Sequence, residues 1–318
     1  WINMVHDYWM YRDDPAFVRN CISGVKTILE WFADKVDKKT GMLGAIPHWN
    51  FVDWPTQWPW SKDKPTGGVP PGGMTGGSSI LTLQLAYTLK DAVELLDHFG
   101  EKDLAAQYDS LRISLCENTW KHCWVEKQLL CDDILKTSYS QHANIMGILS
   151  DAIPVKLQQD LLTRLDTTSS LIQATFYYRF YLFRALKKVG LADQYVSMLK
   201  PWQDMLGMGL TTFAENPEPS RSDCHAWSAS PVLDFLATIC GVEPAEAGFR
   251  SVKIEPHLGC LNRVEGKIPH PLGNISIILE RENKGINGKI VLPEGLSGRF
   301  IWNKQALVLH SGQNLIDL

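Results

Sequence analysis

Residues 79–120 read SILTLQLAYTLKDAVELLDHFGEKDLAAQYDSLRISLCENTW, the pattern of two amphipathic helices joined by a glycine. Apolar residues recur every three or four positions, as Leu81 and Leu85 do, which predicts a helix with one buried face. Gly100 is of the residue type that most often ends helices, because it adopts the left-handed backbone found there. The same apolar spacing then resumes, so we predict a second helix over 102–120.

Helical patterns also lie on both sides of this hairpin. Together with it they predict helices over residues 14–36, 79–99, 102–120, 142–149, 155–164, 171–189, 192–206 and 230–240. Helical hairpins in series form either a barrel of paired helices or an α-solenoid. A solenoid needs a repeat of fixed period, and the sequence has none. The sequence therefore predicts a mainly α protein with an α/α barrel.

The pattern changes from helical to β near Glu243. Alternating or β-branched runs predict strands over residues 251–255, 275–280, 289–292, 299–302 and 306–309, and Asn287-Gly288 has the composition of a hairpin turn. Strands this short indicate a small antiparallel β-sandwich beside the helical domain. We therefore predict an α/α-barrel domain over 1–244 and a C-terminal β-sandwich domain over 245–318.

The composition argues against some partners. A formal net charge of −4, with acidic and basic residues interspersed, disfavours nucleic acid, since phosphate binding needs a clustered positive surface. No apolar run approaches the roughly 20 residues that cross a bilayer. The seven cysteines have no C-x-x-C spacing and no acidic run matches a calcium loop, so we predict no metal and no cofactor.

The start of the chain is uninformative. It begins at Trp1 with neither an initiator methionine nor a signal-peptide pattern, which leaves the native N-terminus open. Localisation is unknown from the sequence, with a periplasmic or secreted protein as one alternative. The oligomeric state is also open, because no coiled-coil heptads are present.

Tryptophan is unusually frequent, at 12 residues, and several lie in a long loop over residues 44–77 that is rich in proline and glycine. A flat indole face matches the C–H face of a pyranose, and loops this long tend to be functional. We predict that Trp49, Asp53 and Trp54 bind substrate. The alternative is a Trp-rich plug that closes one end of the barrel.

The segment 209–228 reads GLTTFAENPEPSRSDCHAWS and lies between two predicted helices. Glycoside hydrolysis needs one carboxylate that activates water and one acid that protonates the leaving oxygen, and Glu215 is a candidate for such a role. His225 and Arg221 can hydrogen-bond sugar hydroxyls, and Trp227 can stack on a sugar. The alternative is a surface loop in which Glu215 or Asp223 forms a salt bridge with Arg221.

A polar cluster at 138–144 is better explained by helix capping than by a site. It contains His142, which lacks the spacing of a metal ligand. Thr175 and Tyr177 are individually weak candidates for the barrel mouth.

These motifs resemble those of the inverting α-L-rhamnosidases of glycoside hydrolase family 78. The resemblance rests on TTFAE at 211–215 and SDCHAWSASP at 222–231, and extends to MVHDYW at 4–9, FVDWP at 51–55, SILTLQ at 79–84, GFRSVKIEP at 248–256 and VEGK at 264–267. It implies an (α/α)6 barrel that hydrolyses terminal α-L-rhamnosides by single displacement with inversion.

The resemblance also implies roles for individual residues. Glu215 matches the general base, and His225 matches a histidine at the sugar. The expected substrate-binding residues, for a carbohydrate that contains L-rhamnose, are Trp49, Asp53, Trp54, Phe213, Arg221, His225 and Trp227.

One motif of the family is missing. The family's general acid is a Glu in a segment that begins Asp-Cys-Pro, and this sequence has no such string. We expect a fragment that lacks the first barrel helices, with the acid ahead of Trp1 and little activity in this chain alone. The alternatives are another α/α-barrel glycosidase and a non-catalytic carbohydrate-binding protein that lacks the acid.

Overall fold

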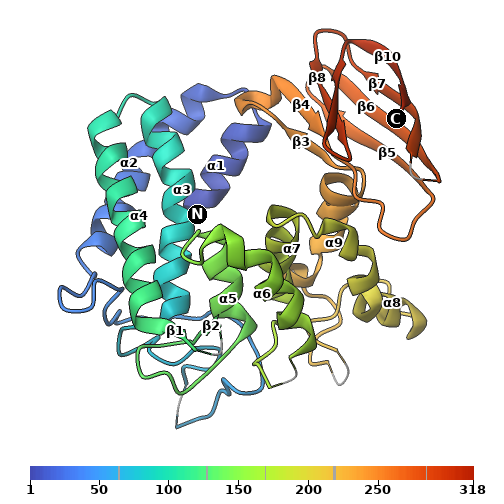
Figure 1. Ribbon diagram of the computed structural model, residues 1–318. Helices are drawn as coiled ribbons and strands as arrows, with labels where there is room; N and C mark the ends of the chain where they lie inside the picture. Colours follow the sequence, from blue (N-terminus) through green and yellow to red (C-terminus); the bar gives the residue numbers. More distant parts are fainter. Residues whose placement is uncertain (64, 127, 169, 218–219, 284) are drawn as a thin grey trace. The chain divides into compact units, whose positions relative to one another are not determined.

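The chain forms two compact units (Figure 1). The computed structural model describes residues 1–63, 65–126, 128–168, 170–217, 220–283 and 285–318. The first unit comprises Trp1–His6 and Ala16–Val189, and the second comprises Asp7–Pro15 and Gly190–Leu318. The predicted domain boundary between residues 244 and 245 stays a prediction.

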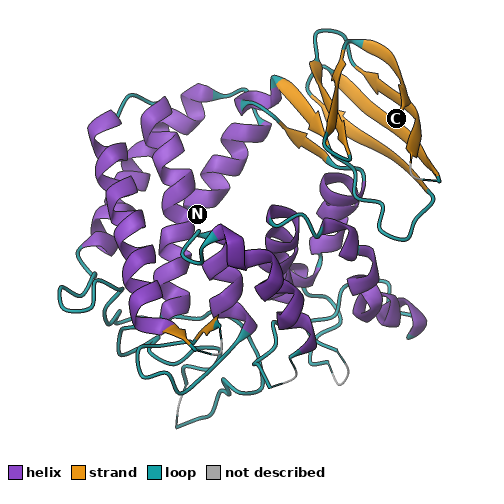
Figure 2. Ribbon diagram, in the orientation of Figure 1, coloured by secondary structure: helices purple, strands orange, loops and turns teal. Residues whose placement is uncertain are grey.

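The first unit is built mainly of helices (Figure 2). They are the start of α1 (Ile2–Tyr11), α2 (Pro15–Ala33), α3 (Ser79–His98), α4 (Lys102–Cys123), α5 (Gln141–Leu149), α6 (Val155–Thr167) and α7 (Phe176–Lys188). The predicted hairpin is confirmed as α3 and α4, and α5 packs against α3, α6 and α7. The apolar stripe of α3 is buried as its spacing predicts, with Leu85 and Leu89 in the core.

Loops of the first unit gather at one end of its helices (Figure 1). The long loop before α3 lies there with the short hairpin of β1 (Trp124–Val125) and β2 (Leu129–Leu130). Backbone hydrogen bonds join the two: Ile134 N donates to Gly77 O at 3.2 Å, and Ser79 N donates to Asp132 O at 2.9 Å. The Trp-rich loop is therefore anchored to the helical core.

Three helical segments differ from the prediction. Helix α1 was not predicted, and α7 begins only at Phe176, because residue 172 is held in an extended bridge to Ser140. The predicted helix over 192–206 is broken into η1 (Ala192–Gln194), η2 (Val196–Leu199) and α8 (Lys200–Gly207). Pro201 explains the boundary between η2 and α8, since it lacks the N–H that would continue a helix from the preceding turn.

The second unit combines short helices with two β-sheets (Figure 2). Besides α8 it has η3 (Ala226–Ser228), α9 (Ser230–Asp234), the π-helical turn η4 (Phe235–Ile239) and η5 (Ala247–Phe249). Its strands are β3 (Val242–Pro244), β4 (Ser251–Ile254), β5 (Arg263–His270), β6 (Gly273–Glu282), β7 (Gly285–Leu292), β8 (Ser297–Trp302), β9 (Gln305–Leu309) and β10 (Gly312–Asp317). One sheet has the order β10-β7-β6-β5 and the other β3-β4-β8-β9.

Each sheet buries one face. In β6 the alternating residues Ile275, Ile277 and Leu279 are fully buried, and in β4 so are Val252 and Ile254. This alternation is what a strand with one face on a core requires. The fold class is confirmed: a mainly helical chain followed by a β domain of two sheets.

Two details of the β domain were predicted wrongly. The sheets are not wholly antiparallel, because β4 pairs with β8 in parallel. Asn287-Gly288 is not a turn but lies inside β7, where Gly288 faces Leu279. A Cβ at Gly288 would lie 2.1 Å from Ile278 O, so glycine here permits close strand packing rather than a turn.

No helix among the described residues is long and apolar enough to cross a membrane.

Candidate active site

The loop that carries Glu215 folds back on itself. His225 N donates to Phe213 O at 2.7 Å, and Glu215 N donates to Ser222 O at 2.8 Å. These bonds place the two arms of the loop side by side without forming a regular strand pair. The segment thus has a fixed backbone at Glu215.

The carboxylate of Glu215 is buried and bound by Arg221. The residue is 2% exposed, and its side chain is bound at both oxygens: Nη2 of Arg221 donates to Oε1 at 2.6 Å, and Nε donates to Oε2 at 3.1 Å. Such a bidentate pair fixes the orientation of the carboxylate plane. Arg221 itself is exposed, with a side chain 75% accessible. The guanidinium of Arg221 can therefore move into solvent without disturbing the protein core.

The aromatic residues of this loop pack around Glu215. Nε1 of Trp227 donates to Glu215 O at 3.4 Å, and the rings of His225 and Trp227 lie 4.2 Å apart. Ser228 Oγ donates to Ala214 O at 2.7 Å, so the base of the loop is tied down as well. The second unit thus brings together five residues predicted from the sequence: Phe213, Glu215, Arg221, His225 and Trp227.

A cavity of about 330 Å³ lies beside this loop within the second unit. Its wall is largely apolar and includes Trp202, Phe213 and Phe235. Nε1 of Trp202 donates to Ser228 O at 2.8 Å, which joins the cavity wall to the Glu215 loop.

Asp53 is in the first unit and is fully buried. Nε2 of His142 donates to its Oδ2 at 2.7 Å, the backbone N–H of Thr175 donates to the same oxygen at 2.8 Å, and Oγ1 of Thr175 donates to Oδ1. A buried carboxylate is costly unless its oxygens are bonded in this way. These partners bind both oxygens of the Asp53 carboxylate. Direct contact of Asp53 with a sugar stays a prediction.

Trp49, Phe51, Trp54 and Tyr177 form a cluster that we call the aromatic wall. Ring centroids lie 5.2 Å apart for Phe51–Trp54, 6.1 Å for Trp49–Trp54 and 6.0 Å for Phe51–Tyr177. Trp49 is exposed and donates from Nε1 to Gly67 O at 2.9 Å. Burial, and then the charge of Asp53, raise the pKa of Tyr177, which keeps its hydroxyl neutral.

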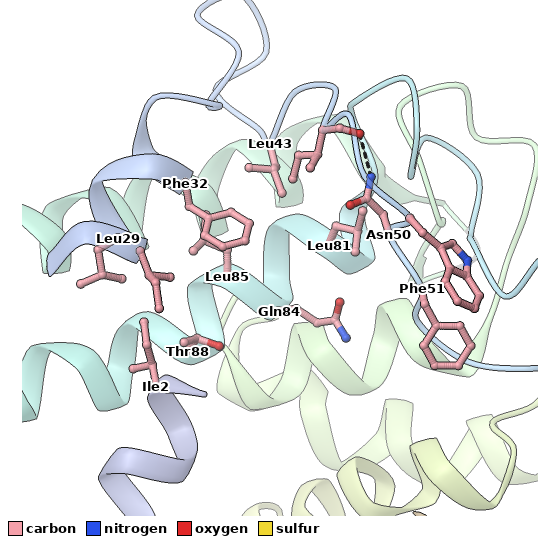
Figure 3. Close-up of a pocket in the computed structure, with 13 residues that line it drawn as sticks. Ile2, Leu29, Phe32, Leu43, Asn50, Phe51, Leu81, Gln84, Leu85 and Thr88 are labelled. Atoms are coloured by element: carbon pink, nitrogen blue, oxygen red, sulfur yellow. Dashed lines mark hydrogen bonds between the residues drawn. The ribbon is translucent and has the colours of Figure 1, made fainter. Parts of the chain in front are cut away.

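Beside the aromatic wall, a cavity of about 310 Å³ opens between the loop and helices α2 and α3 (Figure 3). Phe51 and Asn50 line it from the loop, and Gln84 and Thr88 line it from α3. The remaining lining is apolar, and Asn50 donates to Ile46 O at 3.0 Å. A neutral ligand with both apolar and hydroxyl groups suits such a lining.

The capping predicted for 138–144 is confirmed, since Oγ of Ser140 accepts from Ala143 N at the start of α5. In addition, His142 and Thr175 bond Asp53, and Tyr177 belongs to the aromatic wall. Phe51 had no role of its own. No local pattern marks His142 and Thr175, since their partner Asp53 is far away in the sequence.

Among the described residues, no group of three or more His, Cys, Asp or Glu side chains is placed to hold a metal ion. The expectation that no cofactor is needed stays an expectation.

Two family models match consecutive parts of this chain. The model of the bacterial alpha-L-rhamnosidase 6 hairpin glycosidase domain matches residues 1–239, and that of the bacterial alpha-L-rhamnosidase C-terminal domain matches 241–313. The chain belongs to the bacterial α-L-rhamnosidase family. The resemblance noted in the sequence is thereby confirmed, and with it the six-hairpin glycosidase fold.

Individual relatives of this rhamnosidase-family chain are distant and longer. An alpha-L-rhamnosidase of Alteromonas sp. (strain LOR) is 23% identical over 245 residues, which cover 70% of this chain and 26% of the relative. The crystal structure of the GH78 family rhamnosidase of Bacillus sp. GL1 superposes with a TM-score of 0.79 at 23% identity, over 95% of this chain and 32% of the other. The Streptomyces avermitilis alpha-L-rhamnosidase complexed with L-rhamnose superposes with a TM-score of 0.73 at 16% identity, over 96% and 31%. This chain thus spans about a quarter to a third of these relatives.

Proposed function

We propose that this chain carries the general base, Glu215, of an inverting α-L-rhamnosidase. The observation that carries this proposal is the buried Glu215 carboxylate, oriented by Arg221 in the same loop as His225 and Trp227. Family membership supports the substrate class, a terminal α-L-rhamnoside.

The chemistry follows from an inverting mechanism. The Glu215 carboxylate takes a proton from water, and the oxygen of that water attacks the anomeric carbon as the bond to the leaving oxygen breaks. A carboxylic acid on the other side of the ring protonates the leaving oxygen, and the two carboxyl groups stand roughly 6.5–9.5 Å apart to admit the water. His225 and Trp227 bind the sugar hydroxyls and ring face, and Trp49 and Trp54 are proposed as further sugar-binding residues.

Arg221 has a defined part in this scheme. Each carboxylate oxygen can accept more than one hydrogen bond, so water can bind Glu215 while Arg221 stays bonded to both oxygens and holds the carboxylate plane.

The test is hydrolysis of p-nitrophenyl α-L-rhamnoside by this chain, and by the chain with any residues that its gene encodes ahead of Trp1. Glu215→Gln should lower kcat by about 10²–10⁴, the usual contribution of a positioned base. The matched control is Asp223→Asn, an exposed carboxylate in the same loop, which should keep near-normal activity. Proton NMR of the first product should show the β anomer.

Other results would change the assignment. Near-normal hydrolysis by Glu215→Gln would remove the general-base role. Hydrolysis of other aryl glycosides in place of the rhamnoside would indicate a different α/α-barrel glycosidase. Binding of L-rhamnose without hydrolysis by either form would indicate a carbohydrate-binding protein.

A further inference from the structure

Two helices and the Trp-rich loop of the first unit meet at one buried carboxylate. Asp53 comes from the loop, His142 from α5, and Thr175 stands just before α7. His142 and Asp53 both have fully buried side chains. The bonds span 89 and 122 residues of sequence, so they hold distant segments together.

The hydrogen-bond chemistry fixes how the ring of His142 is used. An ionised carboxylate only accepts hydrogen bonds, so Nε2 of His142 carries the proton that it shares with Asp53. Nδ1 of His142 is buried and has no hydrogen-bond partner among the described residues. The ring is instead packed between aromatic neighbours, with centroids 4.7 Å from Trp58 and 4.4 Å from Tyr178. These neighbours restrict rotation of the His142 ring, and its one hydrogen bond is to Asp53.

Asp53 and its partner Thr175 each lie within two residues of the aromatic wall in the sequence. Trp54 follows Asp53 directly, and Tyr177 is two residues after Thr175. Because Thr175 donates both its N–H and its hydroxyl to Asp53, the start of α7 is fixed against the loop. The contact of Phe51 with Tyr177 joins the same two segments at the wall itself.

We propose that Asp53, His142 and Thr175 are positioning residues that hold the aromatic wall in its sugar-binding arrangement. This proposal rests on the proposed function for its ligand, an α-L-rhamnosyl group. In this proposal the carboxylate acts through Trp54 and Tyr177, in place of the predicted direct contact of Asp53 with the sugar.

The experiment uses the whole chain labelled with 5-fluorotryptophan. The ¹⁹F signals of Trp49 and Trp54 are assigned from Trp49→Phe and Trp54→Phe, and Trp302 in the β domain is the reference. The variants are Asp53→Asn, Thr175→Val, which is nearly isosteric but lacks the hydroxyl donor, and Thr175→Ser, which restores that donor. Thr163→Val removes a hydroxyl bonded to Gln159 O on α6 and is the matched control.

We expect Thr175→Val and Asp53→Asn to shift or broaden the Trp54 signal while the Trp302 signal stays. Their Kd for L-rhamnose, measured by calorimetry, should rise by about three- to tenfold or more, as loss of one buried hydrogen bond implies. Thr175→Ser should restore both values, and Thr163→Val should change neither. An unchanged Trp54 signal in folded Thr175→Val would overturn the positioning role.

The two proposals can fail separately. If neither this chain nor the chain with any residues that its gene encodes ahead of Trp1 binds L-rhamnose, the proposed ligand is wrong. The ¹⁹F signals still decide whether Asp53 orders the wall. If L-rhamnose binds and Thr175→Val alters neither Kd nor the Trp54 signal, only the positioning role is lost. Should Asp53→Asn fail to fold, the pair Thr175→Val and Thr175→Ser decides alone.

Discussion

Arg221 and Glu215 form a bidentate ion pair whose two members lie in very different surroundings. The carboxylate side chain is 3% exposed and the guanidinium side chain is 75% exposed, with Nη2 and Oε1 only 2.6 Å apart. A surface ion pair contributes little to stability because water screens it, whereas a buried carboxylate depends on its partner. The pair therefore orients Glu215 and also offsets the cost of burying its charge.

Arg221→Ala should lower hydrolysis of an aryl α-L-rhamnoside about 10- to 100-fold, because Glu215 loses charged hydrogen bonds that orient it. Arg221→Lys should recover only part of this loss, since an ammonium cannot bond both oxygens as a guanidinium does. The measurement is kcat and KM in whichever form of the protein hydrolyses the substrate. Equal activity of the Lys and Arg forms would show that the bidentate geometry is unimportant.

Gly68→Ala should destabilise the first unit by about 3 kcal/mol, through a strained left-handed backbone and overpacking. Gly68 has φ +73°, and a Cβ there would lie 2.5 Å from the Phe51 ring and 2.8 Å from Asp53 O. Gly100→Ala is the control: φ is +91° but nothing lies within 4 Å, so we expect about 1–2 kcal/mol. Urea denaturation measures both variants, and equal losses would contradict the close packing at Phe51.

Asp151→Asn should cost about 1 kcal/mol at pH 7, after allowance for solvent screening of a partly exposed group. Burial alone would raise the pKa of Asp151, but its bonds to Lys188 and Lys90 outweigh burial and lower the pKa to about 2. A lowered folded-state pKa means stability that is present above the unfolded pKa of about 3.9 and lost as the pH falls toward 2.

The difference between Asp151→Asn and the parent chain should therefore shrink between about pH 4 and pH 2. Urea midpoints at several pH values measure it. Asp109→Asn, which breaks a pair within the surface of α4, is the control and should have little effect at any pH. A pH-independent difference at Asp151 would mean that its charge contributes nothing.

Two exposed and two buried cysteines should differ in how fast their thiols react. Cys224 and Cys260 are exposed and should react rapidly with a disulfide reagent at pH 8, whereas Cys116 and Cys240 should react only after unfolding. Burial raises the pKa of Cys240 to about 11, so little thiolate forms there. Counting released thiolate before and after denaturant tests this, with Cys224→Ser removing one fast thiol. Rapid reaction of Cys240 would show that the packing at the end of η4 opens readily.

Local patterns in the sequence predicted much of this protein. The spacing of Leu81, Leu85 and Leu89 determined helix α3, because a helix buries whichever face carries its apolar side chains. Glu215, Arg221 and His225 lie within eleven residues, from 215 to 225, so one segment was enough to identify them as a group. The Pro201 break and the parallel pairing of β4 with β8 depend on weaker or non-local terms and were missed.

The surroundings of Asp53 were decided only by tertiary structure. Its sequence neighbours suggest a sugar ligand, yet the folded chain buries it against His142 and Thr175, 89 and 122 residues away. Hydrogen bonds act over about 3 Å, so such partners are set by how helices pack and not by spacing along the chain. The sequence by itself thus determined most of the helices and the residues of the Glu215 loop, while packing decided that Asp53 is buried against His142 and Thr175.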